Sequence, residues 1–556
     1  MRMTSYHQAK VEDTFDAIVI GSGMGGLTAA SLLARHAGRR VLILERHYTP
    51  GGFTHVFHRP GYQWDVGVHY IGEVNDPASQ MRAAFDHLTD GRLEWHAMPD
   101  VYDRVFLGGR EYEFVSGAER FRDRLKEYFP SEGPAIDGYF RAVRSCTRAS
   151  DLYFAAKAVP GLIERLAGPL MRAPFLRHAG CTTAEILAGL GCSRELTGVL
   201  TAQWGDYGLP PGQSSFGIHA IVASHYFNGA AYPVGGAGAF VETMVPAIEA
   251  AGGRLLVSAD VKEVLLDHRG RAIGVRMQDG REFRAATVIS DAGAANTYRR
   301  LLPPSLPETR DVMHKIERIP ASMAHISLYV GLKSNSEELG IDPANLWICP
   351  SADHDGNVSR SEASCDAPLP VLFISFPSAK DPTFVARYPG RATIEVVAPA
   401  PFAWFEKWAD TRWKHRGMEY DQLKAALAER LKNELEKAVP QVRGKIDHCE
   451  LSTPLSTRAF TSHERGEIYG LAHVPERFRL RCLGPRTPVP GLYLTGADVT
   501  AAGVSGAMMG GVVAASAILR RNLMSVVTKG VRRPPLDHPA HVPSTLEVRT
   551  SGPAHH

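Results

Sequence analysis

The pattern of apolar and polar residues near the start of the chain predicts a strand, a helix and a second strand. An apolar run at 17–20 leads into a glycine-rich segment and then into a stretch rich in alanine and leucine. A second apolar run at 41–44 ends directly at Glu45. Short apolar runs bounded by turn residues are typical of strands buried on both faces of a parallel sheet. A strand, a glycine turn, a helix, a strand and an acid form the layout that binds a dinucleotide.

The glycine-rich segment reads Gly21-Ser22-Gly23-Met24-Gly25-Gly26. Gly21 allows a tight turn, Gly23 lets the backbone approach a pyrophosphate, and Gly26 lets the helix pack closely on the strand. The free N–H groups at the helix start attract phosphates. Glu45 lies 19 residues after Gly26, where an acid accepts hydrogen bonds from ribose hydroxyls and disfavours the 2′-phosphate of NADP. The alternative is an ordinary strand-helix-strand turn without a ligand.

The residues after Glu45 separate FAD from NAD. Arg46, the pair Gly51-Gly52 and the segment Trp64-Asp65-Val66-Gly67-Val68-His69-Tyr70 follow, and an NAD domain has no reason to carry them. This stretch resembles the flavoproteins of the phytoene desaturase, carotenoid isomerase and retinol saturase family, and the resemblance extends from about residue 15 to 523. It implies an FAD enzyme that desaturates, isomerises or saturates C=C bonds of a long apolar polyene.

The same resemblance extends the cofactor site to two later segments. It implies that the backbone of Val261 contacts the adenine and that Asp498, in Gly496-Ala497-Asp498, contacts the ribityl chain or the pyrophosphate. The helix start at Val504-Ser505 would face the pyrimidine edge of the flavin, which is negative when reduced. The expected cofactor contacts are Gly21, Ser22, Gly23, Met24, Gly25, Gly26, Glu45, Arg46, Gly51, Gly52, Val261, Gly496, Asp498, Val504 and Ser505.

The order of predicted elements indicates two interleaved domains of an α/β protein. We expect a Rossmann-like FAD-binding domain from 15–75, 231–299 and 481–523. The segments 76–230 and 300–480 would form an α+β substrate-binding domain with an antiparallel sheet. We further expect a flexible leader at 1–14 and a disordered tail at 524–556.

Composition excludes several other classes of function. The formal net charge of the 556 residues is only +3, which gives no reason to expect a nucleic-acid partner. The seven cysteines are scattered without metal-ligand spacing, so we expect no metal and a reducing cytoplasmic location. No run is long and apolar enough to span a membrane. Residues 151–180 are apolar and basic, and prolines at 160, 169 and 174 should break them into short helices. These helices either lie on a membrane surface or pack in the core.

The expected chemistry is hydride transfer at flavin N5, with a protein group or water handling the accompanying proton. His69 is the first candidate for that group, with Tyr70 beside it, although His69 could equally be structural. Asp206 and Tyr207 come second, and the third candidates, His219 and His225, could instead line the substrate tunnel. No second glycine fingerprint follows a strand, so the electron donor or acceptor should be external. Two alternatives stay open: an unsaturated fatty acyl substrate, and a non-catalytic lipid-escort protein of the same fold.

Overall fold

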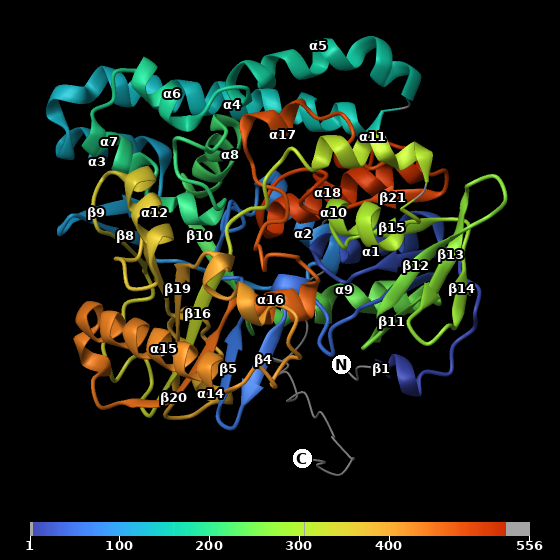
Figure 1. Ribbon diagram of the computed structural model, residues 1–556. Coiled ribbons are helices and arrows are strands. Elements are labelled where there is room, and N and C mark those ends of the chain that lie inside the picture. Colours follow the sequence, from blue (N-terminus) through green and yellow to red (C-terminus); the bar gives the residue numbers. More distant parts are fainter. Residues whose placement is uncertain (1–3, 160, 305, 530–556) are drawn as a thin grey trace.

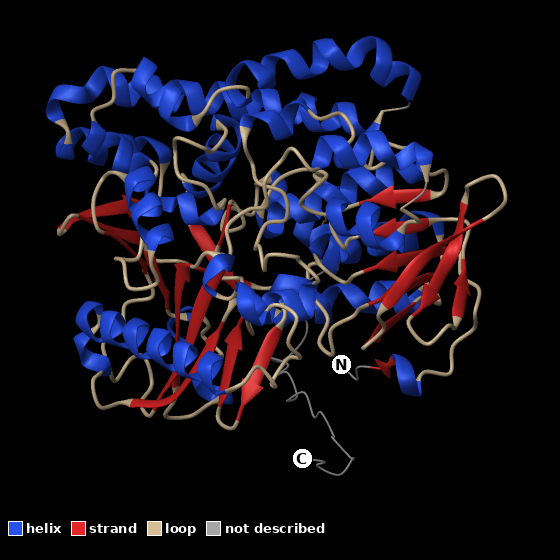
Figure 2. Cartoon of the chain, in the orientation of Figure 1, coloured by secondary structure: helices blue, strands red, loops and turns tan. Residues whose placement is uncertain are grey.

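The computed structural model describes residues 4–159, 161–304 and 306–529. Two large sheets lie on opposite sides of the molecule, and a layer of helices crosses above both of them (Figure 1). Figure 2 shows the two sheets as separate groups of red arrows. Each sheet takes strands from distant parts of the sequence, so the chain passes repeatedly from one side to the other.

The first sheet is parallel, with the strand order β1-β11-β3-β2-β15-β21. Its strands are β1 (Thr4–Ser5), β2 (Ala17–Ile20), β3 (Val41–Leu44), β11 (Arg254–Val257), β15 (Val288–Ser290) and β21 (Leu492–Leu494). Every residue of β2, β3 and β15 is buried, as expected for parallel strands covered on both faces. The predicted strand-helix-strand unit is therefore present, with α1 (Met24–Ala37) between its strands.

The two faces of this sheet are covered differently. Val19 and Ile43 pack in a cluster with side chains of α1, α9 (Gly238–Ala250) and α18 (Gly503–Leu519). Ile18 and Leu42 pack on the opposite face, in a cluster with a small sheet. That sheet consists of β12 (Val261–Leu266), β13 (Ala272–Met277) and β14 (Glu282–Arg284).

The expected flexible leader is wrong for the residues that the structure describes. β1 adds an edge strand to the parallel sheet by pairing with β11. The ring of Tyr6 is buried, and its hydroxyl donates to Asp279 at 2.8 Å. A buried aromatic ring and a paired backbone give this segment enough contacts to outweigh the entropy of ordering it.

The second large sheet has the order β20-β16-β19-β18-β17-β8-β9 and is antiparallel except for the β17–β8 pair. Its strands are β8 (Val101–Leu107), β9 (Arg110–Val115), β16 (His325–Leu332), β17 (Asn345–Cys349), β18 (Leu372–Ser375), β19 (Ala392–Pro399) and β20 (Ile446–Ser452). Helix α15 (Met418–Ala438) covers one face, where Leu427 and Leu431 pack with Ile326 and Leu328. The alternate residues of β16, His325 and Ser327, face a cavity on the other side.

The helical layer contains α4 (Gly133–Ala158), α5 (Gly161–Ala179) and α8 (Phe216–Tyr226). We expected prolines to divide this region, but Pro169 and Pro174 both lie inside α5. Each proline removes one backbone donor, and packing retains the helix: the buried Phe175 ring lies 4.7 Å from the ring of Tyr153 on α4. Leu166 on α5 remains exposed.

The remaining strands pair in two small sheets, β6-β10-β7 and β4-β5. They are β4 (Val56–Arg59), β5 (Tyr62–Asp65), β6 (Ile71–Gly72), β7 (Trp95–Ala97) and β10 (Ala230–Pro233). The remaining α-helices are α2 (Gln80–Thr89), α3 (Ala118–Tyr128), α6 (Thr183–Gly189), α7 (Arg194–Leu200), α10 (Ala294–Asn296), α11 (Pro307–Ile316), α12 (His354–Ala363), α13 (Pro377–Lys380), α14 (Phe384–Arg387), α16 (Pro454–Thr461), α17 (Pro475–Arg479) and α19 (Met524–Val527).

The end of the chain differs partly from expectation. Residues 524–527, expected to be disordered, form α19, whose Val527 is buried. Residues 530–556 of the expected tail lie outside the described residues. Among the helices that the structure describes, none has the length and hydropathy to cross a bilayer.

Candidate functional site

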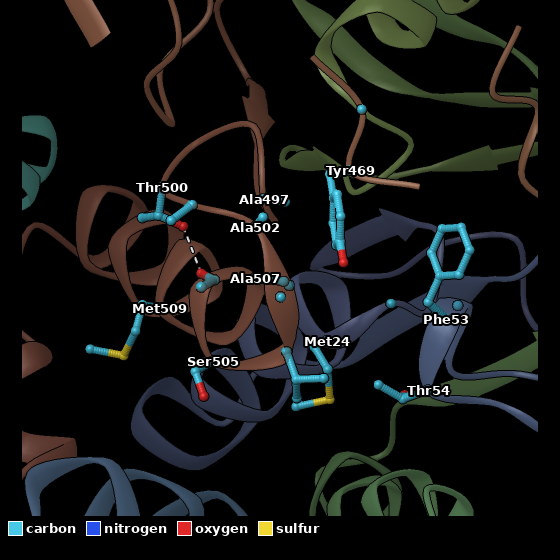
Figure 3. Close-up of a pocket in the computed structure, with 18 of the residues that line it drawn as sticks. Met24, Phe53, Thr54, Tyr469, Ala497, Thr500, Ala502, Ser505, Ala507 and Met509 are labelled. Carbon is cyan, nitrogen blue, oxygen red and sulfur yellow. Dashed lines mark hydrogen bonds between the residues drawn. The ribbon is translucent and has the colours of Figure 1, made fainter. Parts of the chain in front are cut away.

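A cavity of about 1680 Å³ joins the carboxyl edge of the parallel sheet to the face of the antiparallel sheet. Pockets for a single small ligand usually measure about 300–1,000 Å³, so this one has room for a cofactor and a substrate together. Figure 3 shows Met24 and Ser505 on its floor, with Tyr469 and Phe53 on the walls above. The cavity therefore connects the predicted nucleotide turn to the second domain.

The structure brings the first group of predicted cofactor residues together. Gly21 has φ +97°, as the tight turn requires. The Glu45 carboxylate accepts from Ser22 N at 2.9 Å and from Ser22 Oγ at 2.6 Å. Ser22 Oγ in turn accepts from Gly51 N at 2.9 Å. A Cβ on Gly52 would lie 3.0 Å from Gly23 Cα, so the glycine pair closes directly over the turn.

The second group combines residues from the start, the middle and the end of the chain. Arg46, Val261, Gly25 and the α18 residues Val504 and Ser505 all line the same cavity. Ser505 Oγ is a buried polar atom without a hydrogen-bond partner. The first turn of α18 also has N–H groups that no side chain caps. This end of the cavity is therefore ready to bind an electron-rich, hydrogen-bonding group.

Asp498 also lines the cavity, but its carboxylate already has protein partners. It accepts from Ala294 N at 2.7 Å and lies 3.3 Å from Arg477 Nη1. Arg477 is 2% exposed, so this ion pair is buried and links the closing motif to the short helix α17, 21 residues earlier. Direct contact between Asp498 and the cofactor stays a prediction.

Asp291 is a site residue that sequence reasoning missed. A Cβ added to Gly25 or Gly23 would lie 2.6 Å from an oxygen of its carboxylate, and a Cβ on Gly496 would lie 2.4 Å from one. Burial raises the pKa of Asp291 to about 7. An acid directly after a strand at the carboxyl edge of a parallel sheet was a usable signal.

His69 lines the cavity in a dry environment. Its Nδ1 lies 3.0 Å from Glu395 Oε2, without the geometry of a hydrogen bond, and its ring packs edge-on against Phe373 at 4.8 Å. Burial, reinforced by the charge of Lys380, lowers the pKa of His69 to about 3. His69 is therefore neutral at physiological pH and has no ready proton to give.

The other candidates divide into two groups. Tyr70, Asp206 and His225 line the cavity. Tyr207 and His219 do not, and they hydrogen-bond each other at 3.1 Å behind its wall. The structure thus brings Tyr70 and Asp206 together, with 3.4 Å between the tyrosine oxygen and the carboxylate.

A parallel sheet with a glycine turn, a buried acid and a third chain segment in one cavity defines a two-domain flavoprotein oxidoreductase. Residues 24–519 match the family model described as flavin containing amine oxidoreductase. The all-trans-retinol 13,14-reductase of Rattus norvegicus is 36% identical over 539 residues, covering 94% of this chain and 88% of that protein. The chain belongs to the flavin-containing amine oxidoreductase family, in the group that includes the retinol 13,14-reductases.

Two further comparisons agree with this assignment. Prolycopene isomerase of Arabidopsis thaliana is 26% identical and covers 87% of this chain and 79% of that protein. Wild-type putrescine oxidase bound to putrescine superposes with a TM-score of 0.58 at 16% identity, over 91% of this chain and 99% of that one, which shows the fold. The predicted fold, the FAD cofactor and an oxidoreductase acting on C=C bonds are confirmed.

Proposed function

We propose that the protein saturates one C=C bond of a retinoid-like polyene alcohol, with reduced FAD as the hydride source. One observation carries this: a single cavity joins the FAD cradle to an apolar pocket over the antiparallel sheet. The relatives named all-trans-retinol 13,14-reductase support the reaction and the substrate class. When bound, FAD supplies or accepts a hydride at N5.

The residues of the sheet give the pocket its shape. Trp347, Phe373 and Val397 form an apolar wall, and the Tyr469 ring extends into the cavity toward the glycine turn (Figure 3). A flat conjugated chain bound against this wall would be shielded from water. Removing water in this way also protects the hydride from side reactions.

Two polar side chains interrupt the apolar wall. His325 and Ser327 face the cavity from β16, and both His325 Nδ1 and Ser327 Oγ are buried without a hydrogen-bond partner. Burial lowers the pKa of His325 to about 4, so the ring is neutral and can exchange a hydrogen bond with a hydroxyl. This pair favours a polyene alcohol over a hydrocarbon or a fatty acyl chain.

The cavity has a second arm that supports membrane docking. Leu152, Phe154 and Ala155 of α4 line this arm, and Leu152 is also 47% exposed, so the arm reaches the surface there. Leu166 and Leu170 are exposed on the neighbouring α5, and Arg148 and Arg520 stand at the same arm. We infer that this face rests on the cytoplasmic surface of a bilayer and that the lipid substrate enters from it.

The second candidate function is cis–trans isomerisation of a carotenoid, which the prolycopene isomerase relatives favour.

Purified FAD-loaded protein, reduced with dithionite under argon, would be incubated with all-trans-retinol or with prolycopene. We expect retinol to gain two hydrogen atoms and lose conjugation, as seen by mass spectrometry and absorbance. If retinol stays unchanged and prolycopene is isomerised, the protein is a carotenoid isomerase and the proposed saturation is wrong. In the cell an external two-electron donor must replace dithionite.

A further inference from the structure

A cluster of buried polar side chains stands behind the cavity wall at Tyr70. The Tyr70 hydroxyl donates to Asp103 Oδ2 at 2.8 Å and lies 3.4 Å from Asp206 Oδ2. Tyr70 and Asp206 line the cavity, whereas Asp103 lies behind them and is fully buried. Tyr70 and Asp206 thus connect the substrate pocket to Asp103, an acid that no substrate can touch.

Asp103 is surrounded by donors. Its Oδ1 accepts from Asn345 Nδ2 at 2.9 Å, and its Oδ2 accepts from Tyr70, from Gln203 Nε2 at 2.7 Å and from Trp347 Nε1 at 3.2 Å. A carboxyl group that only accepts hydrogen bonds is stabilised in its ionised form. Burial raises the pKa of Asp103 to about 6, while these hydrogen bonds and the charge of Lys380 act against that rise, so the carboxyl group is ionised at neutral pH. Asp103 therefore carries the negative charge of this cluster.

Counting hydrogens places a proton on Asp206. The hydroxyl of Tyr70 has one hydrogen, which points to the ionised Asp103. The amide of Gln203 donates to the Tyr70 oxygen at 3.3 Å. This bond gives Tyr70 no second hydrogen with which to donate to Asp206. The contact between Asp206 and Tyr70 is then favourable only if Asp206 supplies the hydrogen. Two neighbouring carboxyl groups in a dry site also resist carrying two charges.

The surroundings of Asp206 act in the same direction. Burial, followed by the charge of Asp103, raises the pKa of Asp206 well above its usual range. The other titratable groups that face it are the hydroxyls of Tyr226, Tyr469 and Tyr207, which are neutral at physiological pH. The part of Asp206 that is not buried can be reached from the cavity, where a substrate would lie.

We propose that Asp206 is the acid that protonates the substrate, and that Asp103 is a positioning residue that keeps Asp206 protonated and oriented through Tyr70. The inference rests on the proposed reduction. One carbon of the double bond receives a hydride, with both electrons, from reduced FAD, which is left oxidised. The neighbouring carbon takes the proton as the O–H bond of Asp206 breaks. The resulting carboxylate regains a proton from solvent, and an external two-electron donor restores the flavin.

The first test compares Asp206→Asn with Asp447→Asn in FAD-loaded protein reduced with dithionite, with all-trans-retinol as the probe. Asp447 lies on the outer strand β20 and pairs with Lys333 and Arg391 at the surface. We expect Asp206→Asn to lower kcat by about 10²–10⁴-fold, the range for a lost general acid, with FAD content and KM unchanged. Asp447→Asn should match the natural protein. A kcat unchanged in Asp206→Asn would overturn the proposal.

The second test is the pH profile of kcat. Activity needs protonated Asp206, so kcat should fall as pH rises through the pKa of Asp206. Asp103→Asn removes the charge that raises this pKa, so the fall should move to lower pH, whereas a merely structural role would lower kcat equally at every pH. Should Asp103→Asn not fold, Tyr70→Phe should move the fall in the same direction, because it removes the acceptor that holds the Asp206 proton. If kcat falls at the same pH in these variants as in the unmodified protein, the proposed role of Asp103 is wrong.

An infrared titration of the oxidised, substrate-free holoenzyme separates this inference from the proposed function. We expect a protonated-carboxyl C=O band that persists above neutral pH and is absent from Asp206→Asn. A natural protein that shows this band but leaves retinol unchanged would refute the proposed reduction and leave Asp206 established as a protonated acid. If the band is missing, Asp206 is not the proton donor, even if the enzyme reduces retinol.

Discussion

Single residues of the nucleotide turn are fixed by what lies against them. A Cβ on Gly25 would lie 2.4 Å from Gly496 Cα and 2.6 Å from Asp291 Oδ1. These neighbours belong to backbone and to the half-buried carboxyl of Asp291, so they leave little room for an added methyl group. Packing alone therefore requires glycine at position 25, where three distant chain segments meet. Close approach of the cofactor would be a second, independent reason for glycine there.

Gly25→Ala should consequently lose FAD. We expect the variant to be destabilised by about 1–3 kcal/mol through overpacking and to purify without the yellow colour of bound flavin. The matched control is Gly189→Ala in α6, where an added Cβ meets nothing within 4 Å. That control should keep its flavin, and its Tm should be equal or higher, because alanine favours helix. Thermal unfolding and flavin absorbance measure both effects, and a yellow Gly25→Ala protein would contradict this account of the turn.

His325 gives the residue-scale prediction for substrate choice. His325→Leu replaces the neutral ring that faces the cavity with an apolar side chain. We expect kcat/KM for all-trans-retinol to fall by about 10-fold or more, since a lost hydrogen bond to a hydroxyl changes affinity by about 0.5–1.5 kcal/mol and misplaces the reacting bond. Activity with a retinoid hydrocarbon that lacks the hydroxyl should change little. Equal losses with both substrates would assign His325 to packing.

Some site residues could be predicted from the sequence and others could not. The glycine turn and Glu45 lie within one local motif, so spacing alone identifies them. Asp206 was a candidate from the sequence, but its partner Asp103 is far from it in the chain and meets it only through Tyr70, which is 136 residues from Asp206. Nothing local to Asp103 distinguishes it from a surface acid in a strand. His69 could be located from its motif, but its neutral state depends on burial and on Lys380, which no local pattern reveals.

At the scale of elements, strands were predicted more reliably than the helical layer. The apolar runs of β2, β3, β15 and β16 specify buried strands, and the structure has them. In α5 the prolines indicated breaks, but packing against α4 maintains one helix. In the leader, polar residues concealed a strand because its partner, β11, comes some 250 residues later. In both segments tertiary contacts determine the secondary structure, and local sequence propensity carries no information about those contacts.

The exposed leucines of α5 provide the element-scale prediction. Leu166 and Leu170 are 73% and 78% exposed, so replacing both with glutamate should leave Tm nearly unchanged. We expect binding to anionic liposomes in a flotation assay to fall strongly, because two apolar contacts are lost and two charges oppose the lipid headgroups. Replacing the exposed Met418 of α15 with glutamate, on the distant sheet domain, should have no effect. If the unmodified protein does not float with the liposomes, this face does not bind membranes and the proposal is wrong.

At the scale of the whole molecule, the cavity with the predicted cofactor residues is built from segments that are far apart. The turn after β2, the carboxyl end of β15 and the start of α18 line the cavity together. The excursions between them build the antiparallel sheet and the helices that enclose the substrate pocket (Figure 1). FAD bound by these segments would supply its hydride at the boundary between the two domains. Our exact boundaries for those domains stay a prediction.

The most direct test of the central claim is an anaerobic single turnover. Protein carrying fully reduced FAD would be mixed rapidly with all-trans-retinol while the oxidised-flavin band and the polyene band are recorded together. We predict that oxidised flavin returns at the same rate as the polyene band is lost, with one double bond saturated per flavin. Protein that binds no flavin, or reduced flavin that retinol leaves unchanged while the retinol spectrum stays constant, would contradict the account.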